Sequence, residues 1–166
     1  MSKPYIILLD LGDSVGDRNL SYLHRGVGEK EYGKRMAAYI GGAKKKIVLD
    51  TGPPDLERSL KYHPYSKSDP WNPEQEMEAQ LAKAGVKAAE IDVVVLTHLH
   101  WDHVGDVLKF PNAQFICSQE ELRFALDPIT PFDRGCRHPD EARPAMEACG
   151  IDVFATARNM VSPSME

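Results

Sequence analysis

Residues 91–106 read IDVVVLTHLHWDHVGD, an apolar run that passes directly into a cluster of polar side chains. The run is β-branched and almost continuously hydrophobic, which is typical of a strand in the interior of a sheet. The cluster begins where that strand is expected to end. It contains three of the six histidines of the chain and one aspartate: His98, His100, Asp102 and His103.

The residue types in this cluster are those that bind divalent metal ions. Imidazole suits zinc and similar ions, and a carboxylate adds a harder oxygen ligand. Alternate residues of an extended segment point to one side, so we expect His98, His100 and Asp102 to converge. A turn near Asp102 would bring His103 in from another direction, and Gly105 would permit the tight passage of the chain.

The composition of the whole chain narrows the classes of function. The 166 residues are 42% hydrophobic and 27% charged, with a net charge of -5. The one basic run, three lysines at 44–46, is too short to predict a nucleic-acid surface. No apolar stretch approaches the roughly 20 residues of a membrane span. Three widely spaced cysteines give no disulfide framework, which favours a cytoplasmic protein.

Strands and helices are expected to alternate along the chain, which defines the α/β (α+β) class. We predict strands over 5–9, 36–40, 46–50, 91–96 and 113–117, with the second and third forming a hairpin. Helices are predicted over 72–84, with Asn72 as N-cap, and over 118–126, opened by a capping box at Ser118. Residues 11–36 are predicted to be irregular, and the proline-rich segment 52–73 to be a long loop.

The character of the sequence changes after Phe132. Residues 133–166 contain arginine but no lysine, and they carry a weak helical pattern over 141–149. We therefore predict one domain over 1–132 and a divergent C-terminal tail over 133–166. The tail is either a variable extension or a sequence unrelated to the ancestral continuation, for example after a frameshift.

The HxHxDH pattern of residues 98–103 resembles the signature of the metallo-β-lactamase superfamily. Residues 48–52, VLDTG, resemble the DTG turn that this family carries upstream of the signature. The stretches THLHWDHVGD and DTGPPD and residues 115–128 are most similar to the N-acyl-homoserine lactonase-like branch. The resemblance implies the N-terminal half of an αββα sandwich, with a mixed sheet and covering helices.

The resemblance also implies a site with two ions, zinc or another divalent metal. His98 and His100 would bind the first ion, and Asp102 and His103 the second. Asp102 would also handle the proton of a metal-bound hydroxide that opens a lactone or similar ester, as in quorum quenching. Thioester hydrolysis and oxygen reduction on the same scaffold remain open. Asp50 would either support the site from behind or act as a turn residue before Gly52.

Part of the family's ligand set has no match in this chain. The family adds a third histidine, a bridging aspartate and a last histidine, whereas only His138 follows His103 here. Neither His138 nor Cys149 stands at a recognised zinc spacing. We therefore expect a truncated or C-terminally altered hydrolase that acts on a small-molecule lactone or ester. The alternative is a non-catalytic remnant or interaction module that binds metal weakly. Half a sandwich would expose an apolar sheet face, through which a homo-oligomer could form.

Overall fold

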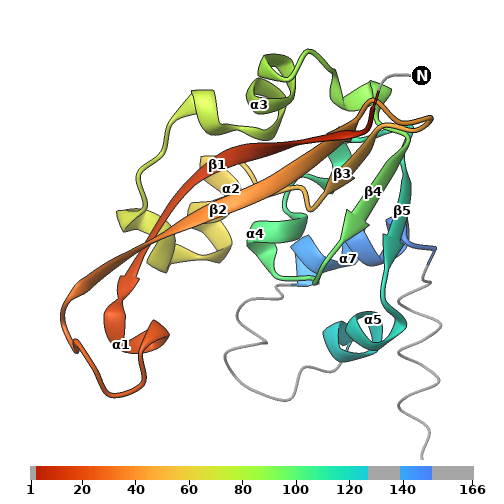
Figure 1. The fold of residues 1–166 in the computed structure, drawn as a ribbon. Helices are drawn as coiled ribbons and strands as arrows, with labels where there is room; N and C mark the ends of the chain where they lie inside the picture. Colours follow the sequence, from red (N-terminus) through yellow and green to blue (C-terminus); the bar gives the residue numbers. More distant parts are fainter. Residues whose placement is uncertain (1–2, 127–138, 151–166) are drawn as a thin grey trace, which may run out of the picture.

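The fold is centred on one mixed sheet of five strands in the order β1-β2-β3-β4-β5 (Figure 1). The computed structural model describes residues 3–126 and 139–150. Neighbouring strands are antiparallel from β1 to β3 and parallel from β3 to β5. The predicted class and mixed sheet are therefore confirmed. The strands are β1 (Tyr5–Asp17), β2 (Lys30–Gly41), β3 (Ile47–Leu49), β4 (Val93–Leu96) and β5 (Gln114–Cys117).

Helices and short 3₁₀ turns fill the connections between the strands. The helices are α1 (Arg18–Ser21), α2 (Leu56–Tyr62), α3 (Met77–Lys83), α4 (Trp101–Val104), α5 (Gln119–Leu126) and α7 (Pro139–Ala148). The 3₁₀ turns are η1 (Pro64–Ser68), η2 (Pro73–Gln75), η3 (Ala88–Glu90) and η4 (Val107–Lys109). Within residues 3–126 and 139–150, no helix has the length and apolar character needed to cross a membrane.

The hydrophobic core lies between one face of the sheet and the helices. The strand register places Tyr39, Val48 and Val94 side by side on this face, and all three are buried. Leu81 of α3 and Met146 of α7 belong to the same buried cluster. Helix α7 thus packs into the common core although it lies in the predicted tail. The boundary at residue 132 stays a prediction, because residues 127–138 lie outside the described part.

The opposite face of the sheet carries apolar side chains that are exposed. Ile6 and Leu8 of β1 are 65% and 67% exposed, and Ile116 of β5 is 46% exposed. The register continues this face through small and aliphatic residues of the strands between them. Such a surface is typical of a face that another layer covers. Association of two chains through it remains a prediction.

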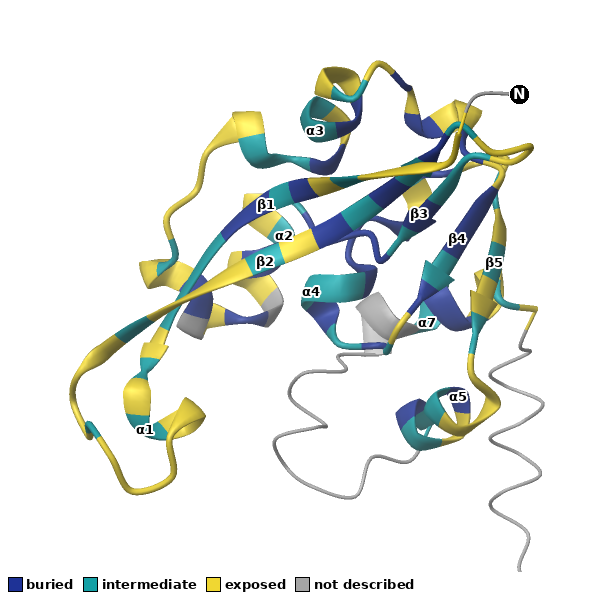
Figure 2. Cartoon of the chain, viewed as in Figure 1, coloured by how far each residue is buried: buried dark blue, intermediate teal, exposed yellow. Residues whose placement is uncertain are grey.

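The N-terminal region differs from the sequence-based prediction. Residues 11–36, predicted to be irregular, continue β1 and β2 as an antiparallel ribbon that ends in α1 (Figure 1). A register shift between Asp10 and Asp13, with Gly12 at φ 101°, marks a bulge where the ribbon begins. Most of the ribbon is exposed (Figure 2). It therefore lacks the apolar alternation from which a strand can be predicted.

Two other elements need smaller corrections. The predicted loop over 52–73 contains α2, whose N-cap Asp55 accepts a hydrogen bond from the Arg58 backbone N–H at 3.0 Å. Asn72 caps only the 3₁₀ turn η2, and α3 begins separately at Met77. At α5, Ser118 caps as predicted, its Oγ accepting from the Glu121 backbone N–H at 3.1 Å.

Backbone hydrogen bonds join the DTG turn to the histidine cluster. The Thr51 N–H donates to the His103 carbonyl at 2.7 Å, and the Gly105 N–H donates to the Gly52 carbonyl at 2.9 Å. A Cβ atom at Gly105 would lie 2.1 Å from the backbone nitrogen of Pro54. Only glycine therefore allows the two turns to approach this closely.

Gly105→Ala is expected to lower the free energy of unfolding by about 3 kcal/mol or more, because the new methyl group meets backbone and must push the turns apart. Urea unfolding of the purified variant measures this loss. The matched control is Gly16→Ala, whose Cβ would meet only an ordinary contact with Leu20 and should change stability by less than about 1 kcal/mol. Equal stability of the two variants would contradict the close approach.

Candidate metal centre

The candidate centre lies at the carboxyl ends of the two neighbouring parallel strands β3 and β4. Asp50 follows β3, and Thr97 and His98 follow β4. Parallel strands deliver the residues after them to the same edge of a sheet, where binding sites of α/β folds commonly form. The strand register therefore brings the DTG turn and the histidine cluster together although they are distant in sequence.

The structure brings the three predicted histidines into contact. The ring centres of His98 and His103 are 3.9 Å apart, and those of His98 and His100 are 4.6 Å apart. The expected extended path is wrong beyond His100, because α4 begins at Trp101 and His100 is its N-cap. Asp102 and His103 therefore lie on a helical turn, from which the ring of His103 still reaches that of His98.

Asp50 is the carboxylate that organises this edge of the sheet. It is 6% exposed, and its Oδ1 accepts from the Thr97 backbone N–H at 2.7 Å. Its Oδ2 accepts from the Thr97 hydroxyl at 2.7 Å and lies 2.8 Å from Nδ1 of His103. A carboxylate on Nδ1 fixes the imidazole orientation and leaves Nε2 for a metal ion. Asp50 therefore orients the imidazole of His103, and its support of a metal site stays a prediction.

The backbone conformation at Asp50 also depends on its contacts with neighbouring residues. Its φ angle is 60°, in the left-handed region that residues other than glycine seldom adopt. Such a conformation costs free energy and persists where surrounding interactions hold it in place. Here the holding interactions are those to Thr97 and His103, together with the Asp50 N–H donating to the Val95 carbonyl at 2.9 Å.

The neighbouring histidines differ in their electrostatic environment. Burial lowers the pKa of His98, and the nearby imidazoles of His103 and His100 lower it further. Burial alone would lower the pKa of His103, but its hydrogen bond to Asp50 and the charge of Asp102 outweigh burial and raise it. His98 is thus biased toward the neutral form that ligates metal.

The donors in the cluster fit part of a metal centre. Three imidazoles and a carboxylate have the right chemistry for a divalent ion, and the contact of Nδ1 with Asp50 fixes the orientation of the His103 ring. Within the described ranges, however, no three His, Cys, Asp or Glu side chains are arranged so as to hold an ion. Catalytic zinc sites use three protein ligands, so further donors must complete the shell. His138, one candidate, lies outside the described residues, and Cys149 follows α7.

The motifs in the sequence did not predict which side chains surround the cluster. Glu121 of α5 accepts a hydrogen bond from the Leu99 backbone N–H at 2.8 Å. The ring of Trp101 stacks on His63, with centres 4.4 Å apart, and Arg35 of β2 approaches Asp102 to 3.8 Å. These partners come from separate segments of the chain. Only the folded structure shows that they meet.

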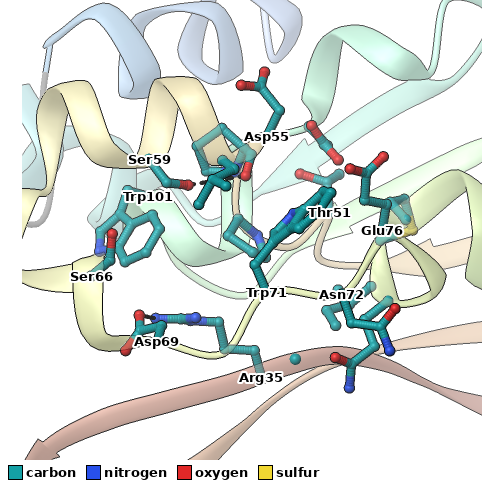
Figure 3. Close-up of a pocket in the computed structure, with 18 of the residues that line it drawn as sticks. Arg35, Thr51, Asp55, Ser59, Ser66, Asp69, Trp71, Asn72, Glu76 and Trp101 are labelled. Atoms are coloured by element: carbon teal, nitrogen blue, oxygen red, sulfur yellow. Dashed lines mark hydrogen bonds and ion pairs between the residues drawn. The ribbon is translucent and has the colours of Figure 1, made fainter.

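A cavity of about 60 Å³ lies beside Trp101 and is walled by β2, the loop after Asp50 and η2 (Figure 3). It adjoins the cluster without including the histidines. Asp106, 4% exposed, lies in its wall with its carboxylate 3.0 Å from Nζ of Lys109. Burial raises the pKa of Asp106 to about 6 in spite of that ammonium group.

Comparison with known proteins identifies the family to which the chain belongs. Residues 33–140 match the family model of the metallo-beta-lactamase superfamily. The chain belongs to this superfamily, and its partial matches lie with the lactonase-like branch. An N-acyl homoserine lactonase, AttM of Azorhizobium caulinodans, is 35% identical over 68 residues, which are 41% of this chain and 26% of that protein.

Solved structures with the same fold include two hydrolases. One is AidC, a dizinc quorum-quenching lactonase in complex with a product. Its TM-score to this chain is 0.65 and its sequence identity is 18%, and the match covers 90% of this chain and 57% of that chain. The other is a probable metal-dependent hydrolase from Staphylococcus aureus, with a TM-score of 0.66 and 16% identity over 87% of this chain and 58% of that chain. The chain thus spans less than two thirds of the length of these relatives.

Asp50→Asn is expected to lower the free energy of unfolding by roughly 1–3 kcal/mol, because an amide offers one acceptor oxygen where the carboxylate offers two. The pKa of His103 should fall as well, since the carboxylate that raises it is removed. Urea unfolding and NMR titration of the metal-free protein measure both effects. Asp92→Asn is the matched control, because that exposed carboxylate accepts only from the Lys46 backbone N–H at 2.8 Å among the described contacts. An unchanged His103 titration in Asp50→Asn would contradict the proposed contact.

Asp106→Asn tests the buried carboxylate. The folded-state pKa of about 6 lies above the ordinary 3.8, so the folded protein binds this proton more tightly than the unfolded chain. The wild type should therefore lose stability relative to Asp106→Asn as pH rises from about 3 to 7, by roughly 3 kcal/mol in total. Unfolding curves of both proteins at several pH values measure the difference. Parallel stability profiles would show that Asp106 titrates normally.

Proposed function

We propose that this chain provides the first half of the dinuclear zinc centre of a hydrolase that opens lactones or similar esters. The observation that carries the proposal is the contact of three imidazoles after β4, with His103 held through Nδ1 by the buried carboxylate of Asp50. A purely structural cluster would not require the metal-facing nitrogen of His103 to be kept available.

The cluster divides into two ligand pairs along the chain. His98 and His100, which leave β4 together, would hold one ion, and Asp102 and His103 on α4 would hold the other. A bound divalent ion would lower the pKa of a water molecule and polarise the substrate carbonyl. The Asp102 carboxylate would then accept the proton released by the attacking water, while Asp50 would keep His103 in the ligating tautomer.

The relatives support an N-acyl-homoserine lactone as the substrate. AttM is named an N-acyl homoserine lactonase, and AidC is a dizinc lactonase solved with a product. Opening this ring would make the protein a quorum-quenching enzyme. Both relatives extend beyond the matched region, so the substrate pocket depends on donors and walls in addition to those described here. A cytoplasmic location stays a prediction from the sequence.

The second candidate is a non-catalytic module that binds metal weakly and associates through its sheet. Two observations favour it. The described donors do not close a coordination shell, and the sheet face of Ile6, Leu8 and Ile116 is exposed. Metal content and hydrolysis distinguish the two candidates, because the module would show neither stoichiometric metal nor turnover.

The test is hydrolysis of N-hexanoyl-homoserine lactone by the zinc-loaded protein, with a phenyl ester and a β-lactam as comparison substrates. The wild type should open the lactone, and His100→Ala should lose at least about 100-fold in kcat/KM together with bound zinc, measured by elemental analysis. His24→Asn removes an exposed histidine of the distant ribbon and should leave both values unchanged. Wild-type protein without zinc and without lactone hydrolysis would favour the non-catalytic module.

A further inference from the structure

Arg35 of β2 is a nearly buried cation that points at one member of the proposed ligand set. Its side chain is 11% exposed, and its Nε lies 3.8 Å from Oδ2 of Asp102. This distance is too long for a hydrogen bond. Among the described residues, Nε has no hydrogen-bond partner although it is buried. A buried donor without a partner is costly, and the carboxylate with which Nε forms a long ion pair is that of Asp102.

The other end of the Arg35 guanidinium is fully anchored. Nη2 lies 2.5 Å from Oδ2 of Asp69 (Figure 3), and Nη1 donates to the Asp13 carbonyl at 3.1 Å. Asp69 is itself fixed, because its Oδ1 accepts from the Val15 backbone N–H at 2.7 Å. The charge of Arg35 is therefore balanced without Asp102. Its approach to Asp102 is not needed to neutralise a buried charge.

The ring of Trp101 packs against the same group. The guanidinium carbon lies 5.0 Å from the centre of the Trp101 ring, a cation–π distance. Trp101 is 5% exposed and stacks on His63. Because Trp101 directly precedes Asp102 on α4, the stacking holds Arg35 against the helical turn that carries the carboxylate. Arginine combines a planar stacking face with directed donors, which lysine cannot do.

We propose that Arg35 is a positioning residue for Asp102, with Asp69 as its anchor; this rests on the proposed function. On binding of a second ion, a shift of about 1 Å would bring one Asp102 oxygen within hydrogen-bond distance of Nε and leave the other oxygen for the ion. Partners that orient a ligating carboxylate in this way commonly contribute 10- to 100-fold to metal affinity. Arg35 thereby couples the ribbon and the segment after η1 to the second metal position.

The test is titration of the metal-free protein with Co²⁺ followed by visible absorption, and with Zn²⁺ followed by calorimetry. Arg35→Lys keeps the charge and removes the Nε donor. We expect its first binding step to stay within about twofold of wild type and its second step to weaken by about 10- to 100-fold. In lactone hydrolysis kcat should fall while KM changes by less than about threefold, because Asp102 acts on the reacting water.

Two further variants separate positioning from a structural role. Lys34→Gln removes a neighbouring exposed cation of β2 that pairs with Asp13 and should change neither binding step. Asp69→Asn weakens the ion pair that anchors Arg35 but keeps an acceptor for the Val15 backbone N–H. It should weaken the second binding step selectively, and it provides the test where Arg35→Lys does not fold. Equal weakening of both steps, or two unchanged steps in Arg35→Lys and Asp69→Asn, would overturn the positioning role alone. Wild-type protein that binds no ion would overturn the proposed function and this inference with it.

Discussion

The buried carboxylate of Asp50 is the constraint on which the candidate site depends. It stands at the end of β3, and its two oxygens are bonded to the backbone and hydroxyl of Thr97 and to the imidazole of His103. This arrangement is available only because β3 and β4 are parallel neighbours whose carboxyl ends meet. The left-handed backbone at Asp50 and the close packing of Gly105 against Pro54 follow from the same requirement. The two turns must approach until a short side chain spans them.

A second carboxylate, that of Asp102, lies near the side chain of Arg35. Arg35 reaches it from β2, stacked on Trp101 and anchored by Asp69. The carboxylates of Asp50 and Asp102 differ in the lengths of their contacts. Asp50 already makes hydrogen bonds of ordinary length to His103 and Thr97, whereas the Arg35–Asp102 distance is still 3.8 Å. This difference is consistent with a centre in which His103 is oriented before an ion binds, whereas Asp102 would change position on binding.

Much of the fold was predictable, because its elements carry the usual local signals. The apolar run 93–96, the hairpin of β2 and β3, the Ser118 cap of α5 and the HxHxDH pattern are all readable along the chain. The ribbon over 11–36 was not, since its strands are solvated and lack apolar alternation. The assignment of His98, His100, Asp102 and His103 as ligands rests on residue type and stays a prediction. The extended path expected for them ends earlier than predicted, because α4 begins at Trp101. Arg35 and Asp69 could not be found, because their roles arise only from contacts between distant segments.

The most direct measurement of the central claim is the tautomer of His103 in the metal-free protein, observed by nitrogen-15 NMR correlation of the imidazole at a pH above its titration. Asp50 beside Nδ1 predicts that the proton resides on Nδ1 and that Nε2 carries the free lone pair. Addition of zinc should then shift the Nε2 resonance while the Nδ1 proton is retained. A neutral His103 protonated on Nε2 would contradict the account, because the nitrogen needed by the metal would then be blocked.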